Sequence, residues 1–205
     1  IVEVERGGFA EAKPYAWQTD SAVARNSWCY TDSLEYKSSN EIICTLIDVV
    51  SKNGNLLLNV GPKADGSIPE GDKKILKDLG DWMKVNGSAI CGAKVWRKSE
   101  EGPTGTKEGQ FQDQQEKIYT EKDFRFTVKG DSIYVFSMHY PADGTVCIRA
   151  LAESANQDVP EFHGIIEDVS ILGFAEKPEW KVTTEGLELH TQNVKSRFPV
   201  VIRVK

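Results

Sequence analysis

Residues 46–62 read Leu46-Ile-Asp-Val-Val-Ser-Lys-Asn-Gly-Asn-Leu-Leu-Leu-Asn-Val-Gly-Pro62, and the architecture predicted for the chain is built around this segment. Its first part continues an apolar pattern with helical spacing from Ile42, behind a Ser38–Glu41 pair spaced as a capping box. Asn53-Gly54 suits a left-handed helix stop. The leucines that follow show no polar alternation, which is typical of a strand covered on both faces. The segment predicts one helix-to-strand unit of a parallel sheet or barrel. The strand's C-terminal end falls at Asn59 to Gly61, and in a barrel this end faces the active site.

The segments on either side of this unit extend the α/β prediction. Residues 1–8 alternate apolar and charged side chains before two glycines, which indicates a strand that leads into a loop. Residues 9–37 are predicted to form a long connection in which tryptophans lie beside polar residues, as is typical of sugar-binding sites. After Pro69, apolar residues recur at 75, 76, 79, 82 and 83, so a second helix is expected to close the α/β part near residue 95.

The composition changes after residue 98 and indicates a second, all-β part. Residues 99–117 are polar and glycine-containing, and are predicted to be a loop or a poorly ordered excursion. Short strand-like segments follow at residues 123–128, 132–139, 145–150, 167–172, 180–184, 186–190 and 200–204. Residues 129–131 and 142–144 are predicted to be hairpin turns, and short strands between such turns favour an antiparallel sandwich. The expected domains are residues 1–96 and residues 97–205.

Composition and charge exclude several classes of partner and cofactor. The net charge of −6 disfavours nucleic acid and anionic membranes, and no apolar run approaches the length of a membrane span. The four cysteines are far apart and lack paired metal-ligand spacing, so they are predicted to be free thiols, most of them buried. The three histidines lie near no carboxylate cluster, so neither a zinc site nor a cofactor is expected.

The chain is expected to be part of a longer polypeptide. It opens in strand-like sequence at residue 1, and a parallel strand needs neighbours that one helix-to-strand unit cannot supply. The chain is therefore interpreted as the C-terminal part of a larger protein, and any targeting segment would precede it.

A series of motifs follow one another over residues 1 to about 96. They are Glu5-Arg6-Gly7, Trp17-Gln18-Thr19-Asp20, Ser27-Trp28-Cys29-Tyr30, the segment 48–69 and the segment 80–90. In their order and spacing they resemble the α-L-fucosidases of glycoside hydrolase family 29, whereas the second half resembles that family only by position and character. The resemblance implies the C-terminal part of a (β/α) TIM-like barrel followed by an antiparallel β-sandwich. It also implies hydrolysis of terminal α-L-fucosyl linkages with retention of configuration.

The resemblance assigns a catalytic role to the start of the chain. Retention needs two carboxyl groups about 5–5.5 Å apart, one a nucleophile and one an acid/base. Glu5 matches the position of the family's acid/base, and Glu3 on the same strand face is the second choice. No motif for the family's nucleophilic aspartate is found, so the chain would supply the acid/base alone and would be inactive by itself. The alternative for Glu5 is an exposed carboxylate paired with Arg6 or a lysine.

Substrate contacts are expected from aromatic residues. Trp28 matches an aromatic that the family places against the apolar side of fucose, and ordinary core packing is the alternative. Trp17 either lines the site or buttresses its loop. Arg6 is expected to orient other groups of the site. Asn59 is either a supporting residue behind the site or a satisfied turn amide.

Two functions follow from these patterns. The first is part of a retaining α-L-fucosidase that acts on fucosylated oligosaccharides or glycoconjugates and is completed by the N-terminal half of the same enzyme. The second is a non-catalytic carbohydrate-binding or structural β-sandwich module with a barrel remnant. The family resemblance favours the first, together with a periplasmic, secreted or lysosomal-type location.

Overall fold

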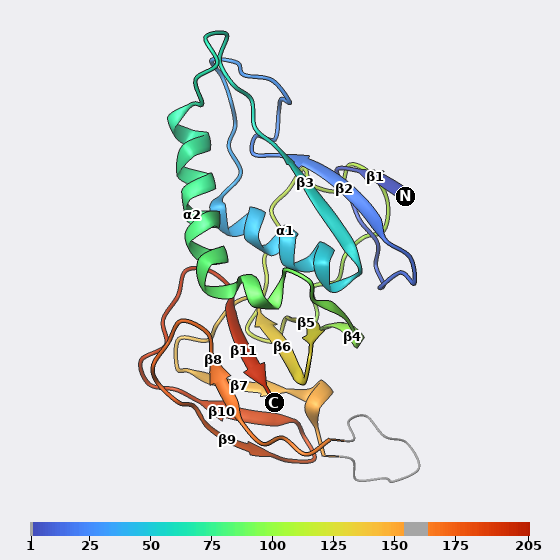
Figure 1. Cartoon of the computed structure of the whole chain (residues 1–205), viewed down its shortest axis with the longest axis vertical. Coiled ribbons are helices and arrows are strands. Elements are labelled where there is room, and N and C mark those ends of the chain that lie inside the picture. Colours follow the sequence, from blue (N-terminus) through green and yellow to red (C-terminus); the bar gives the residue numbers. More distant parts are fainter. Residues whose placement is uncertain (1, 154–163) are drawn as a thin grey trace.

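A parallel sheet and two helices form the N-terminal part of the computed structural model, which describes residues 2–153 and 164–205 (Figure 1). The strands β1 (Val2–Glu5), β2 (Trp17–Ala22) and β3 (Gly54–Asn59) pair in that order and in parallel. Helix α1 (Ser39–Ser51) precedes β3, and helix α2 (Glu70–Asn86) follows it. Figure 1 shows α1 along one face of this sheet and α2 beside α1. The predicted helix-to-strand unit is confirmed.

Helix α1 begins and ends as its sequence predicts. The Ser38 hydroxyl accepts a hydrogen bond from the Glu41 N–H at 3.0 Å, which satisfies one of the free donors of the first turn. Asn53, just past the helix, has a φ of 69°, the left-handed conformation expected at this stop. Ile43 and Ile47 on the apolar face are fully buried against residues of the sandwich.

Strand β2 corrects the prediction that residues 9–37 form one long connection. It lies between β1 and β3, and its side chains alternate along most of its length between a buried and a half-buried face. Thr19 and Ser21 on the buried face are polar, so the strand lacks the apolar alternation by which a sequence reveals a half-buried strand. The Ser21 hydroxyl is satisfied by donating to Asp113 Oδ2 at 2.9 Å.

The second face of the parallel sheet is open in the part of the chain that the structure describes. Leu57 is 54% exposed, so the described residues cover this strand on one face, and the prediction that both faces are covered stays a prediction. Strand pairing places Glu5, Asp20 and Leu57 in one row on this face. Glu3 and Gln18 stand in the neighbouring row. A leucine run predicts that a strand can be covered, but the covering layer has to come from other segments.

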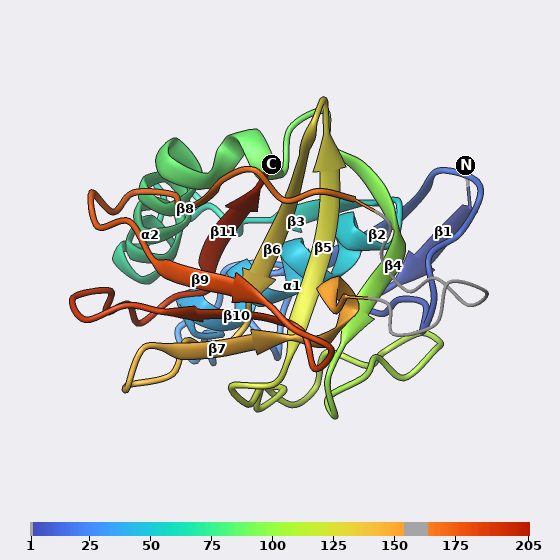
Figure 2. The ribbon, with the colours of Figure 1, turned by 90° about the horizontal axis from the view of Figure 1, so that it is seen from below.

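The C-terminal part is an antiparallel sandwich (Figure 2). Within the described residues one sheet has the strand order β4-β5-β6-β11-β8 and the other β7-β10-β9. Inward side chains such as Phe126 and Ile202 form its core. Strands β5 to β11 confirm the segments predicted from the sequence. The strands are β4 (Lys94–Glu101), β5 (Phe124–Lys129), β6 (Ser132–Ser137), β7 (Thr145–Ile148), β8 (Val169–Ile171), β9 (Glu179–Val182), β10 (Leu187–His190) and β11 (Val200–Val204).

Two details of the sandwich differ from the predictions. Strand β4 crosses the predicted boundary at residue 96 and occupies the start of the segment that was expected to be a loop. Its pairing with β5 shifts register between Val95 and Glu100, which breaks the regular alternation of its side chains. The turn at residues 142–144 joins β6 to β7, which belong to different sheets, so it is not a hairpin turn. The turn at residues 129–131 does join antiparallel neighbours, as predicted.

The two parts of the molecule share an apolar core. Trp82 of α2 lies with Phe136 and Val201 of the larger sheet, in one cluster that also contains two isoleucines of α1, Ile43 and Ile47. The Trp82 indole N–H donates to the Pro199 carbonyl at 2.9 Å. The helical spacing of the sequence places Trp82 on the buried face of α2, and the structure confirms this.

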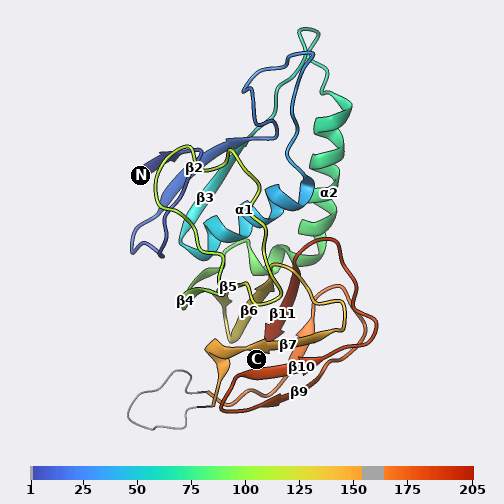
Figure 3. The same cartoon turned by 180° about the vertical axis from the view of Figure 1, so that it is seen from behind.

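The segment between β4 and β5, residues 102–123, crosses back to the parallel sheet (Figure 3). Gly8 and Gly109 exchange backbone hydrogen bonds at 3.1 and 3.0 Å. The Phe111 N–H donates to the Glu5 carbonyl at 3.0 Å, and the next N–H donates to the Arg6 carbonyl at 2.8 Å. Of the two predicted alternatives, a loop or a poorly ordered excursion, the structure shows a loop, and this β4–β5 connection is hydrogen-bonded across the end of β1.

Gly54, the first residue of β3, packs against Trp17, and Gly54→Ala is expected to destabilise the chain. A Cβ at this position would lie 2.6 Å from the Trp17 ring and 2.8 Å from Val49. Overpacking of this kind costs about 1–3 kcal/mol. Gly80→Ala is the matched control, because Gly80 lies inside α2 and a Cβ there meets no heavy atom within 4 Å. That change should stabilise the helix by about 0.5–1 kcal/mol. Urea unfolding of both variants measures the two changes in the free energy of unfolding. Changes of the same sign in both variants would refute the packing argument.

Candidate active site

The turn after β1 carries Glu5 and Arg6, two of the residues singled out from the sequence. Arg6 has a φ of 49°, a left-handed conformation that is uncommon for a residue with a side chain. Two side chains of β2 hold this turn. Asp20 Oδ1 accepts from the Arg6 N–H at 3.0 Å, and Thr19 Oγ1 accepts from the Gly7 N–H at 3.3 Å. They fix the backbone at the point where Glu5 ends the strand.

Arg6, Trp28 and Asn59 come together at the C-terminal end of the parallel sheet. The Arg6 guanidinium carbon lies 4.6 Å from the centroid of the Trp28 ring, a cation–π arrangement. Asn59 ends β3 and donates from Nδ2 to the Trp28 carbonyl at 2.7 Å. Trp28 is half-buried and keeps an accessible surface, and Glu5 is exposed. The structure thus gathers residues from three separate segments of the sequence at one edge of the sheet.

Trp17 does not join this group. It is fully buried at the start of β2, where its indole N–H donates to the Lys52 carbonyl at 2.9 Å and its ring packs edge-on against Phe9. Of the two roles that the sequence leaves open, buttressing fits this position, because no surface of the ring is accessible to a sugar. Glu3 is exposed in the row of Gln18, from whose amide it accepts a hydrogen bond at 3.2 Å.

Asp113 of the β4–β5 connection reaches the same edge of the sheet and is not recognisable from the sequence. Its Oδ2 accepts from Arg6 Nε at 3.2 Å, from the Ser21 hydroxyl at 2.9 Å and from Lys37 Nζ. Burial alone would raise the pKa of Asp113, but the hydrogen bond and charge of Lys37, the hydrogen bond of Ser21 and the charge of Arg6 together hold the pKa below its ordinary value. Asp113 lies in a polar stretch 107 residues from Arg6, so no local signal marks it.

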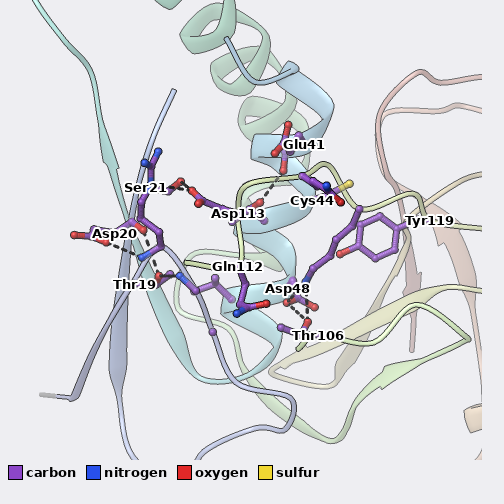
Figure 4. A pocket seen from close by; sticks show the side chains of 17 residues that line it. Thr19, Asp20, Ser21, Glu41, Cys44, Asp48, Thr106, Gln112, Asp113 and Tyr119 are labelled. Atoms are coloured by element: carbon purple, nitrogen blue, oxygen red, sulfur yellow. Dashed lines mark hydrogen bonds and ion pairs between the residues drawn. The ribbon is translucent and has the colours of Figure 1, made fainter. Parts of the chain in front are cut away.

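A small cavity lies beneath the turn, between β2, α1 and the β4–β5 connection (Figure 4). Arg6, Asp20, Asp113 and Tyr119 are among the residues that line it. Its free volume is about 60 Å³, far below the roughly 300–1,000 Å³ of sites that enclose a small molecule. Burial raises the pKa of Cys44 in its wall to about 12, so this thiol is not a nucleophile at neutral pH. The cavity therefore lies behind the candidate site and is too small to hold a sugar.

A second buried ionic cluster lies at the other end of α1. Asp48 Oδ1 is 2.6 Å from Arg125 Nε and 3.0 Å from Lys52 Nζ, and Asp48 Oδ2 accepts from the Thr106 hydroxyl at 2.6 Å. Lys52 also pairs with Glu100 at 2.8 Å. Burial alone would raise the pKa of Asp48, but the charges of Arg125, Lys52 and Lys117 and the Thr106 hydrogen bond together hold the pKa well below its ordinary range. This cluster joins α1 to the sandwich, with Asp48, Lys52 and Arg125 buried at its centre and Glu100 partly exposed at its edge.

Metal and membrane features can be assessed for residues 2–153 and 164–205. No group of His, Cys, Asp or Glu side chains in these ranges could hold a metal ion. No helix there is long and apolar enough to cross a membrane. All four cysteines lie in these ranges and are free, as predicted, but Cys29, Cys91 and Cys147 are exposed. The prediction that most are buried is therefore wrong, because only Cys44 lies on an apolar helix face.

Sequence comparisons relate both parts of the chain to one group of enzymes. The alpha-L-fucosidase family model matches residues 1–88, and the model of the alpha-L-fucosidase C-terminal domain matches residues 114–201. The tissue alpha-L-fucosidase of Rattus norvegicus is 30% identical over 140 residues, which are 66% of this chain and 26% of that protein. The plasma alpha-L-fucosidase of Homo sapiens is 34% identical over 94 residues, 44% of this chain and 20% of that protein. The chain thus spans about a quarter of the length of these relatives.

Solved structures give the same result. The crystal structure of Thermotoga maritima alpha-fucosidase in complex with fucose matches with a TM-score of 0.72 and 28% sequence identity. The match covers 95% of this chain and 40% of the chain of that structure. These matches, over both the parallel-sheet part and the sandwich, place the chain among the glycoside hydrolases. The chain belongs to the α-L-fucosidase family, glycoside hydrolase family 29.

Proposed function

We propose that this chain is part of a retaining α-L-fucosidase, which hydrolyses terminal α-L-fucosyl linkages of glycans by double displacement. The observation that carries the proposal is the grouping of Glu5, Arg6 and Trp28 at the C-terminal edge of the parallel sheet in a member of this family. An accessible carboxylate can move a proton at a glycosidic oxygen, and an accessible indole face can pack on the C–H surface of a sugar.

Glu5 is the proposed acid/base, and Trp28 the proposed contact to the apolar side of fucose. In the first displacement Glu5 would protonate the leaving oxygen while a carboxylate nucleophile attacks the anomeric carbon. In the second, Glu5 would deprotonate the water that releases the sugar. The nucleophile would stand about 5–5.5 Å from Glu5 and would come from the N-terminal half of the same enzyme. Arg6 and Asn59 would support Trp28 through the contacts described above.

The parallel sheet is proposed to be one portion of a (β/α) barrel. Its open face supports this, because the apolar side chain of Leu57 is exposed in the same row as Glu5 and Asp20. The remaining strands would complete the barrel and would place their own side chains opposite this face. Residues 1–96 would then belong to the catalytic barrel and residues 97–205 to the sandwich domain.

Hydrolysis of an aryl α-L-fucoside by the full-length protein that contains this chain tests the proposal. We expect turnover in which the first-formed sugar has the α configuration. Proton NMR of the anomeric signal measures this configuration. The 205-residue chain alone should show no turnover, since one carboxylate cannot complete a double displacement. Turnover by the isolated chain, or a first-formed β-fucose, would be incompatible with the proposed mechanism.

A further inference from the structure

Asp113 reaches the site from outside the motifs that resemble the family. Asp113 lies in the β4–β5 connection, and this connection is hydrogen-bonded to the carbonyls of Glu5 and Arg6 themselves. We propose that Asp113 is a positioning residue of the sugar site, which holds the Arg6 guanidinium against Trp28. This inference rests on the proposed function, because it assumes that Trp28 contacts the sugar.

The contacts of Arg6 leave its guanidinium little freedom. Nε donates to Asp113 Oδ2 at 3.2 Å, and NH2 donates to the Ala24 carbonyl at 3.0 Å. The two acceptors belong to different segments and fix two edges of the planar group, so its flat face is set over the Trp28 ring at 4.6 Å. The side chains of Arg6 and Asp113 are 8% and 14% exposed, so water competes weakly for these bonds.

The charge balance at this point also depends on Asp113. Its carboxylate stands between two cations, Arg6 and Lys37, and both contact the same oxygen. An amide in its place would leave two neighbouring positive charges without their shared counter-ion. Like charges at such a distance repel, and the guanidinium would be expected to move away from its place over Trp28.

The β4–β5 connection does not depend on Asp113 for its own anchoring. Asp123 accepts from the backbone N–H groups of Thr104 and Thr120, each at 2.7 Å, and closes the base of the connection. Thr106 reaches Asp48 at 2.6 Å farther along. Asp123 touches no residue of the Arg6–Trp28 pair, so Asp123→Asn is a matched control that weakens the connection without altering the charges at the site.

Kinetics of the full-length enzyme test the inference. Asp113→Asn is expected to raise the KM for an aryl α-L-fucoside and the Ki for free fucose by about 10-fold each, the effect of one hydrogen bond to a charged group. Its kcat should change by less than about 3-fold, since Asp113 does not touch the reacting atoms. Asp113→Glu should restore part of the affinity. Asp123→Asn should lower Tm and leave KM and Ki unchanged.

A double-mutant cycle shows whether Asp113 acts through Arg6. In an Arg6→Gln background, Asp113→Asn should produce no further rise in Ki. Unchanged KM and Ki in Asp113→Asn, or a full additional rise in the Arg6→Gln background, would overturn the positioning role while leaving the fucosidase intact. A full-length wild-type enzyme that neither hydrolyses fucosides nor binds fucose would instead overturn the proposed function, and this inference with it.

Discussion

Glu5→Gln in the full-length enzyme is expected to slow the hydrolysis of fucosides with poor leaving groups by about 10²–10⁴-fold, the usual contribution of a general acid. Glutamine has the shape of glutamate but cannot donate a proton to the leaving oxygen. Substrates whose leaving group departs unprotonated, such as a dinitrophenyl fucoside, should be slowed much less in the first step. The measurement is kcat/KM for a series of aryl fucosides plotted against the pKa of the released phenol.

Azide provides a second readout for the same variant. The anion attacks the fucosyl-enzyme without a general base, so it should restore part of the deglycosylation rate of Glu5→Gln and produce fucosyl azide. Glu3→Gln is the matched control, because Glu3 lies on the same strand face one row away from Glu5. If Glu5→Gln left every substrate unaffected, the acid/base assignment would be wrong, and Glu3 would be the next residue to examine.

Asp48→Asn is expected to cause the largest loss of stability, about 3–5 kcal/mol, the range seen when one partner of a buried ion pair is removed. The change removes one of the two carboxylates that Arg125 and Lys52 share, since Glu100 also pairs with them at 3.4 and 2.8 Å, and both cationic side chains are 1% exposed. Urea unfolding of the 205-residue chain measures the difference. Asp81→Asn is the control, because Asp81 pairs with Lys77 and Lys84 on the surface of α2 and should change stability by less than about 1 kcal/mol.

The pH dependence of Asp48→Asn has a defined sign. The pKa of Asp48 is lower in the folded chain than in the unfolded chain, where it is about 3.9. Its stabilising effect is therefore complete above that unfolded value and is lost as the pH falls below it toward the folded pKa. The stability difference between wild type and Asp48→Asn should be constant from pH 5 to 7 and should narrow below about pH 4. A difference that stays constant down to pH 2.5 would exclude the ionised form of Asp48 as its source.

Much of the fold could be predicted because its signals are local. The Ser38 cap, the Asn53 stop and the apolar face of α1 each depend on residues within one or two turns of one another. Strand β2 was not predictable in this way, because Thr19 and Ser21 put polar side chains on its buried face. Their partners belong to other segments, and no window of sequence that contains β2 also contains Asp113.

The candidate site likewise has features that the sequence predicts and features that only the structure shows. The family motifs point to Glu5, Arg6, Trp28 and Asn59, and the structure brings Arg6, Trp28 and Asn59 into contact. The motifs do not say that Trp17 is sealed in the core, since an indole beside polar residues has the same local pattern whether it is exposed or buried.

By itself the sequence determined the family, the helix limits and most strands. Tertiary structure alone decided that Trp17 is buried, that one sheet face is open among the described residues, and that Asp113 pairs with Arg6. The physical reason is the separation along the sequence of the residues that interact. Periodicity and capping act between neighbours along the chain, whereas the ion pair between Arg6 and Asp113 joins groups 107 residues apart and exists only once the chain has folded.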